Sequence, residues 1–303
     1  MTRKRKLRVF PIFCVVCVIA IVFFAVYLLK DLLSDAETNN SKEIEKTPSV
    51  STSTPNEAIT ENKEPPAEFP EEDTTIFVDG APKPIFTHAE LIEKYPSSVL
   101  TKTEDGGKDY LKDIVFIGDS TTHGMIFYEV LDGGKETKQV WTPKSGTLSM
   151  WNLLSENIVY PEDDSEMLIG DAIAVNRPKI VVLTLGVNGV SMLSEEEFVG
   201  YYQDLIDEIK ERSYDTKIIL QSIYPVCDDY QYVNSISMEK INRANSWIAA
   251  LADKNGVFYL NTITALVNDK GYLNKDYSNG DGIHLSKEGF NVILNYIRTH
   301  KIK

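Results

Sequence analysis

The chain has 303 residues, of which 43% are hydrophobic and 25% charged, and its formal net charge is −14. All 45 acidic residues lie at or beyond Asp31, whereas six of the 31 basic residues precede it, so the chain from Asp31 onward carries a net charge of −20. This excess of acid argues against nucleic acid as a partner and against a polybasic attachment to anionic lipid, because both depend on Lys and Arg. Solubility is the simpler explanation of the acidity.

An uncharged apolar segment runs from Val9 to Leu29, directly after a cluster of basic residues. About 20 such residues cross a bilayer core as a helix, and the basic flank stays on the cytoplasmic side. We therefore expect residues 1–33 to form a cytoplasmic tail and a transmembrane helix of a single-pass protein in the cell membrane, with an extracellular C-terminal domain. A cleaved signal peptide is the alternative, but the segment ends without an Ala-x-Ala pattern.

Residues 34–75 are rich in Glu, Thr, Ser, Pro, Asn and Lys. Such a composition cannot bury enough apolar surface to fold, so we expect a disordered acidic linker that acts as a tether. Two of the three cysteines, Cys14 and Cys17, lie in the apolar segment, and Cys227 stands alone. The domain beyond the linker is therefore expected to have no disulfide and no zinc site.

Residues 76–112 are expected to form an N-terminal extension packed on the main domain. Ile76–Val78 followed by Asp79-Gly80 is typical of a short hairpin. The stretch Thr87–Glu90 has the form of a capping box and predicts a helix, which Pro96 limits.

From Asp113 onward, apolar runs alternate with helical patterns, which favours a parallel sheet covered by helices on both faces in a domain of residues 113–303. The strand candidates are Ile114–Ile117, Gln139–Thr142, Ile180–Leu185, Lys217–Ile223 and Val257–Leu260. The helical patterns are Leu148–Glu156, Glu195–Arg212, Met238–Lys254 and Lys287–His300.

The first strand candidate ends abruptly at Gly118-Asp119-Ser120, which predicts a tight turn into a helix. Ser120 then lies at the carboxyl end of a strand, where open α/β sheets place their sites. We interpret Ser120 as a candidate nucleophile, which requires a base, an orienting acid and oxyanion donors elsewhere in the chain.

His284 is the candidate base because Asp281 precedes it by three residues. In a turn, an aspartate at this spacing can bind one ring nitrogen and leave the other to face the serine. A loop histidine capped by an aspartate, with no catalytic role, is the alternative.

Two further loops follow strand candidates. Asn188, in Gly186–Gly189, could direct its amide at a developing oxyanion, although an Asn-Gly turn without chemistry has the same sequence. Gly146 could offer a backbone N–H in a tight loop; alone, this is a weak signal.

Together these residues resemble the SGNH (GDSL-type) hydrolase family, which is named for a Ser, a Gly, an Asn and a His in successive blocks. Gly118–Ser120 is similar to the first block, Gly186–Asn188 to the third and Asp281–His284 to the last, while Gly146 is a candidate for the second. The resemblance covers about residues 113–302.

The resemblance implies a flavodoxin-like three-layer α/β/α sandwich with a five-stranded parallel sheet, and ester hydrolysis without a metal or cofactor. Ser120 would attack an acyl carbonyl, His284 would move its proton and Asp281 would orient His284. The N–H groups of Ser120 and Gly146 and the amide of Asn188 would hold the oxyanion.

One departure concerns Gly189, because the family usually has Asp at this position. Since Asn188 itself is present, the oxyanion role survives. The local loop geometry, and with it the substrate class, stays open.

Four residues could form the rim of the substrate site. His123, three residues after Ser120, could bind substrate or act as a rival base, or be an ordinary polar residue of a first helical turn. Trp141 and Trp151 could form an aromatic platform for a sugar or pack in the core. Tyr224 follows a strand candidate and could reach the pocket.

The sequence therefore predicts a serine esterase that removes small acyl groups, acetyl above all, from cell-wall or other carbohydrate outside the membrane. A lipid acyl hydrolase or an acyltransferase would use the same triad. An SGNH-like domain that binds glycan or protein without catalysis is an alternative of another class, although it would not need Ser120, Asp281 and His284 together.

Overall fold

The computed structural model describes residues 81–303. The expected transmembrane helix, the linker at 34–75 and the hairpin signal at 76–80 lie outside the described residues. Within residues 81–303, every helix is too short or too polar to cross a membrane.

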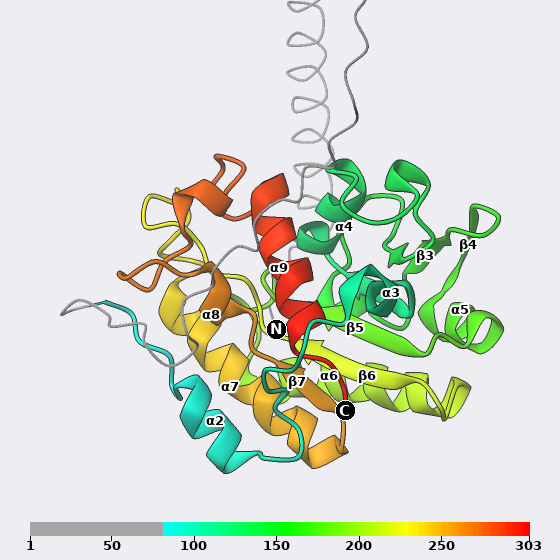
Figure 1. The fold of residues 1–303 in the computed structure, drawn as a ribbon, viewed down its shortest axis with the longest axis horizontal. Coiled ribbons are helices and arrows are strands. Elements are labelled where there is room, and N and C mark those ends of the chain that lie inside the picture. Colours follow the sequence, from blue (N-terminus) through cyan, green and yellow to red (C-terminus); the bar gives the residue numbers. More distant parts are fainter. Residues whose placement is uncertain (1–80) are drawn as a thin grey trace, which may run out of the picture. The chain divides into compact units, whose positions relative to one another are not determined.

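A five-stranded parallel sheet forms the centre of the domain, as predicted (Figure 1). Its strands are β1 (Ile114–Gly118), β2 (Val140–Trp141), β5 (Ile180–Thr184), β6 (Lys217–Gln221) and β7 (Phe258–Leu260). They lie in the order β2-β1-β5-β6-β7, so β1 is flanked by β2 and β5, the next two strands of this sheet along the chain. This is the flavodoxin-like order, and the crevice at the carboxyl end of β1 is its switch point.

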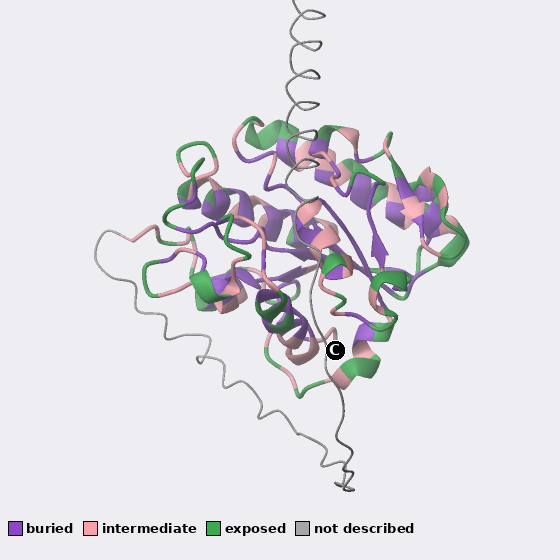
Figure 2. Ribbon diagram, turned by 90° about the horizontal axis from the view of Figure 1, so that it is seen from above, coloured by how far each residue is buried: buried purple, intermediate pink, exposed green. Residues whose placement is uncertain are grey.

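Alternate residues of each central strand enter two separate cores. Val115 and Ile117 of β1 belong to one core, and Ile114 and Phe116 belong to the other. Because both faces are covered, the strand sequence is continuously apolar rather than alternating. Figure 2 shows the buried residues concentrated in the middle layer, between helices whose outer faces are exposed. The three-layer α/β/α arrangement follows.

The helices are α2 (His88–Lys94), α3 (Gly107–Lys112), α4 (Ser120–Phe127), α5 (Ile169–Asn176), α6 (Glu195–Arg212), α7 (Met238–Asn255), α8 (Ile263–Leu266) and α9 (Lys287–Thr299). Helices α6 and α7 contribute to the core that contains Val115, whereas α3, α4 and α9 contribute to the core that contains Phe116. The sheet is thus covered on both faces.

The helix predicted at Leu148–Glu156 is wrong. Only a 3₁₀ turn forms there, over Met150–Asn152. Leu148, Met150 and Leu153 are buried because this loop packs against the core, and their spacing imitates a helical pattern. An antiparallel hairpin that the sequence did not predict follows, formed by β3 (Asn157–Tyr160) and β4 (Ser165–Leu168).

Within residues 81–112, the stretch Ser98–Leu100 pairs with the free edge of β7, and Thr103 and Gly106 bond to the end of α9. Helix α2 begins with the predicted capping box, in which the Thr87 side chain accepts from the Glu90 N–H. Further on, Val99 forms a parallel bridge with Tyr259, and the Leu100 N–H donates to the Tyr259 carbonyl at 2.9 Å. The extension therefore covers an edge that would otherwise expose unpaired backbone groups.

Candidate active site

Ser120 is the first residue of α4, directly beyond the carboxyl end of β1. The chain turns at Asp119, the N-cap residue, whose side chain accepts from the Thr121 N–H at 3.0 Å. A cap of this kind satisfies a backbone donor that the first helical turn leaves unpaired. The turn places the serine hydroxyl at the sheet edge where the sequence predicted it.

The loop from Ser278 to Leu285, which is closed by a bridge between these two residues, carries Asp281 and His284. One Asp281 oxygen accepts the N–H of Ile283 at 2.9 Å and the N–H of His284 at 2.8 Å. The loop thereby folds back on the aspartate, and the second carboxylate oxygen is directed to the imidazole ring.

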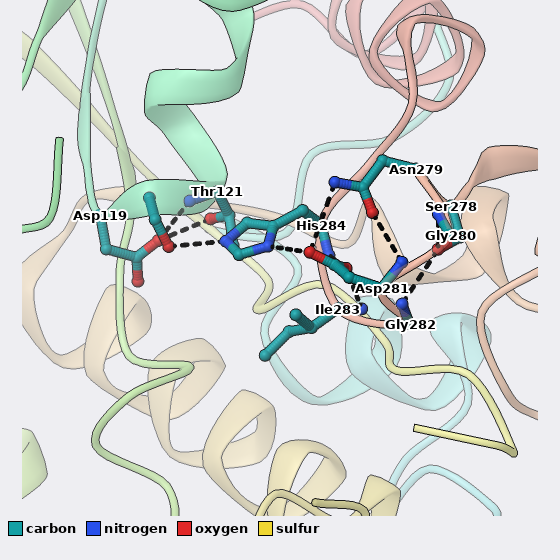
Figure 3. A network of polar contacts seen from close by, with 10 residues as sticks. Asp119, Thr121, Ser278, Asn279, Gly280, Asp281, Gly282, Ile283 and His284 are labelled. Carbon is teal, nitrogen blue, oxygen red and sulfur yellow. Dashed lines mark hydrogen bonds and ion pairs between the residues drawn. The ribbon is translucent and has the colours of Figure 1, made fainter. Parts of the chain in front are cut away.

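Ser120, His284 and Asp281 form a hydrogen-bonded row, and Figure 3 shows the His284 ring beside Asp281 within this network. The Ser120 Oγ lies 2.9 Å from His284 Nε2, and His284 Nδ1 lies 2.7 Å from Asp281 Oδ2. With Nδ1–H donating to the carboxylate, Nε2 is left to accept the serine proton. This is the arrangement in which a hydroxyl becomes a nucleophile, since the imidazole takes its proton and the carboxylate stabilises the imidazolium.

The Asp281 carboxylate is electrostatically prepared for this contact. Partial burial raises its pKa. Hydrogen bonds from the His284 and Ile283 N–H groups and from the His284 ring lower the pKa by more than burial raises it, so the pKa lies below its ordinary value. Asp281 is therefore ionised at neutral pH and can stabilise a positive charge on the ring.

Asp119 is a buried carboxylate directly before the serine, and burial raises its pKa despite hydrogen bonds from Thr121. Its Oδ1 also accepts from the Thr121 hydroxyl at 2.7 Å. This one side chain therefore holds the first turn of α4, in which Ser120 lies. Asp119 stands in the Gly-Asp-Ser motif, but the motif alone does not show that its carboxylate is buried and caps the helix.

Asn188 lies in a tight turn after β5, in which the Gly189 N–H donates to the Gly186 carbonyl at 2.8 Å. Gly186 has φ +117°, and a Cβ there would lie 2.7 Å from the Phe198 ring. The half-buried Asn188 amide has no hydrogen-bond partner among residues 81–303, so its N–H groups are available to a ligand. At Gly189, an added Cβ would lie 3.1 Å from Met150, so this position has little room for the Asp that the family usually has.

Gly146 does form a tight loop with φ +73°, but its N–H is engaged. It donates to the Pro143 carbonyl at 2.7 Å and closes a turn. In this conformation the Gly146 N–H is not free to bind an oxyanion, because it is already bonded within the loop. The expected role of Gly146 as an oxyanion donor is therefore not met here.

Two expected rim residues belong to the core. Trp141 is fully buried, donates from Nε1 to the Lys138 carbonyl at 3.2 Å and packs edge-on against Tyr160. Tyr224 is also buried, and its hydroxyl accepts from the Gln221 amide at 3.1 Å. Both rings can be buried because their apolar bodies pack in the core and their polar atoms find partners inside the protein. Neither ring therefore forms part of the rim.

The other two expected rim residues are accessible. Trp151 is 42% exposed, in the loop after β2. His123 is half-buried one turn after Ser120 on α4, and burial lowers the pKa of its imidazole. The rival-base role of His123 is not supported by the contacts, since the ring that bonds Ser120 is that of His284.

A parallel α/β sheet with this row of side chains at its carboxyl edge is the arrangement expected for an SGNH-type hydrolase. The model of the GDSL-like Lipase/Acylhydrolase family matches residues 116–292, more than half of the chain. The chain belongs to this family. Comparison with curated protein sequences gives no significant match.

Several solved structures are similar to the chain. A Streptococcus pneumonia protein provisionally described as a platelet activating factor has 22% identity and a TM-score of 0.47, over 61% of this chain and 81% of that one. A GDSL-like lipase from Bacteroides thetaiotaomicron has 18% identity and a TM-score of 0.43, over 68% and 92%. A carbohydrate esterase family 3 protein from Talaromyces cellulolyticus has 16% identity and a TM-score of 0.41, over 61% and 93%.

Proposed function

We propose that the chain is an extracytoplasmic serine esterase that removes small acyl groups, in particular acetyl, from cell-wall or other carbohydrate. The observation that carries the proposal is the row Ser120–His284–Asp281, with 2.9 Å and 2.7 Å between successive partners. A domain that only binds glycan or protein has no need of a serine hydroxyl aligned with an imidazole and an ionised carboxylate.

In the proposed reaction, the Ser120 oxygen attacks the acyl carbonyl while His284 Nε2 takes the hydroxyl proton. His284 then gives that proton to the departing alcohol, and an acyl-serine remains. Water attacks the acyl group with His284 again as the base, which releases the acid and restores the serine. The Ser120 N–H and the Asn188 amide stabilise the oxyanion in both halves of the reaction.

A pocket of mixed character lies beside the helix that carries the serine. It reaches His123, one helical turn after Ser120, and is lined by the lysines Lys135, Lys138 and Lys144 and by apolar residues that include Ile126 and Val140, but by no member of the row. The lysines suit a charged or hydroxyl-rich leaving group. The apolar pocket of the domain is lined by residues of the extension, α7 and α8, among them Pro82, Phe86 and Met238, and includes no member of the row.

The test is ester turnover by the full chain. We expect hydrolysis of p-nitrophenyl acetate faster than of p-nitrophenyl octanoate, and release of acetate from an acetylated polysaccharide. Ser120→Ala is the matched control. Absence of turnover, or equal turnover in the Ser120→Ala protein, would disprove the proposal. A preference for octanoate would favour a lipid substrate, and ester transfer to an added sugar alcohol would favour an acyltransferase.

The location is part of the same proposal. The uncharged segment Val9–Leu29 with the basic cluster before it supports a single membrane anchor with the domain outside. Protease added to intact cells should then digest the domain, whereas a cytoplasmic epitope should survive. Protection of the domain until the cells are lysed would contradict the outward orientation.

A further inference from the structure

His123 occupies a position that the proposed ester reaction leaves unexplained. It lies on α4, three residues after Ser120, so the two side chains emerge on the same side of the helix. Its Nδ1 is 2.9 Å from Thr142 Oγ1, where β2 gives way to the Gly146 loop. The imidazole thus links the helix that carries the nucleophile to the start of the loop that carries the second family block.

The ring of His123 also contacts that loop directly. A Cβ built on Gly146 would lie 3.1 Å from both Cγ and Cδ2 of His123, which is tighter than almost all real contacts of such an atom. Because Gly146 has φ +73°, the loop needs glycine there for its backbone as well. The loop backbone at Gly146 therefore lies so close to the imidazole that a side chain would not fit between them.

Two hydrogen bonds lie within the loop. The Gly146 N–H donates to the Pro143 carbonyl at 2.7 Å, and the Thr147 N–H donates to Ser145 Oγ at 3.3 Å. The flanks of the loop are held to the rest of the domain, since the Val159 N–H donates to the Thr142 carbonyl at 2.9 Å and Leu148 is buried in the core. The contacts of His123 join the loop to α4.

We propose that His123 is a positioning residue, which holds the Pro143–Thr147 loop against α4 and so sets the width of the site beside Ser120. The proposal rests on the proposed esterase reaction. Burial lowers the pKa of the imidazole, so the ring is neutral at neutral pH. The bond to Thr142 holds with either tautomer of the neutral ring, since a hydroxyl can donate or accept.

The matched variants are His123→Ala, Thr142→Val and His123→Asn, measured in the full chain. His123→Ala removes the ring and the bond, Thr142→Val removes only the bond, and His123→Asn retains a polar atom near the position of Nδ1. Displacement of a reacting arrangement by about 1 Å costs roughly 10²-fold in rate. We expect kcat of His123→Ala to fall about 10- to 100-fold with KM within about twofold, kcat of Thr142→Val to fall less, and His123→Asn to recover part of the loss.

Coupling and local exchange separate positioning from substrate binding. The double variant His123→Ala/Thr142→Val should be no slower than His123→Ala alone. The two changes remove the same hydrogen bond, so their effects do not add. Amide exchange of residues 144–147 should quicken in His123→Ala at an unchanged Tm. Phe127→Ala, at an exposed position of the same helix, should match the wild type in kcat and exchange.

Three results would overturn the proposal. The first is an unchanged kcat in His123→Ala, and the second is unchanged amide exchange of the loop in that variant. The third is a rise in KM without a fall in kcat in His123→Ala, while Thr142→Val has the kinetics of the wild type. The last would make His123 a direct substrate contact. If the wild type turns over no ester, the esterase proposal fails by itself, and loop exchange in the same variants still decides whether His123 holds the loop.

Discussion

Gly118 and Thr122 are so close that a Cβ at position 118 would lie 2.0 Å from the Thr122 hydroxyl oxygen. The same atom would lie 2.4 Å from the Thr184 carbonyl of the neighbouring strand, which is backbone and cannot rotate away. The glycine of the Gly-Asp-Ser turn is therefore required by the close approach of α4 to β5.

Gly118→Ala is expected to destabilise the protein by about 1–3 kcal/mol, the usual cost of overpacking, and to lower ester turnover because Ser120 follows two residues later. Urea unfolding and kcat measure the two effects. Gly200→Ala is the control, because a Cβ there meets nothing within 4 Å and alanine favours the interior of α6. Equal stability of the two variants would contradict the steric argument.

Asn188→Asp should lower kcat about 10²- to 10³-fold, since it replaces an oxyanion donor by a carboxylate of the same shape. KM should change little, because the donor acts on charge that develops after binding. Initial-rate kinetics on p-nitrophenyl acetate make the comparison. A normal kcat at an unchanged Tm would show that Asn188 does not face the oxyanion.

Asp119 gives a pH prediction. Its folded-state pKa is raised by burial above the unfolded value of about 4. A raised carboxyl pKa contributes stability that is complete below pH ~4 and is lost as the pH rises through the folded pKa. The unfolding free energy of the wild type relative to Asp119→Asn should therefore fall as the pH increases from 4 to 8.

The control for Asp119 is Asp163, whose pKa is lowered by hydrogen bonds from the Ser165 side chain and N–H. A lowered pKa contributes stability that is present above pH ~4 and lost as the pH falls through the folded pKa. The difference between wild type and Asp163→Asn should be nearly constant from about pH 5 to 8. Parallel curves for the two variants would contradict the assignment of Asp119.

The two tryptophans beside the Gly146 loop should behave differently. Trp141→Ala should cost about 3–5 kcal/mol, as expected for a fully buried aromatic ring. Trp151→Ala should change stability by about 0.5 kcal/mol or less, because 42% of the residue is exposed. Urea unfolding of both variants measures this. A small effect of Trp141→Ala would place that ring back among the rim candidates.

The sequence predicts the central strands well because their runs are apolar on both faces. Ile114–Ile117 and Ile180–Leu185 come within one residue of β1 and β5 at either end. The hairpin of β3 and β4 was not predicted, because its strands are short and half exposed and turn at Asp164, which has φ +60°. The turn propensity of a sequence does not predict a non-glycine residue with a positive φ, because such residues are uncommon.

The candidate site was predictable where chemistry requires particular residue types at a short spacing. Asp281 and His284 lie three residues apart, so a local turn brings them together, and the strand end places Ser120. Trp141 and Tyr224 stay open between the rim and the core in the sequence, which does not show which side of a strand end faces solvent, and the structure buries both. The engaged N–H of Gly146 is a matter of loop conformation, which composition does not reveal.

The bridge between Val99 and Tyr259 joins the extension to the edge strand of the sheet. The family match begins at residue 116, yet the backbone of Ser98 and Leu100 pairs with Tyr259 of β7. A fragment that starts at Asp113 would leave β7 with an open strand edge, a template for pairing with a second molecule. Self-association of such a fragment would therefore be a result of where the chain was cut, and not of how the enzyme assembles.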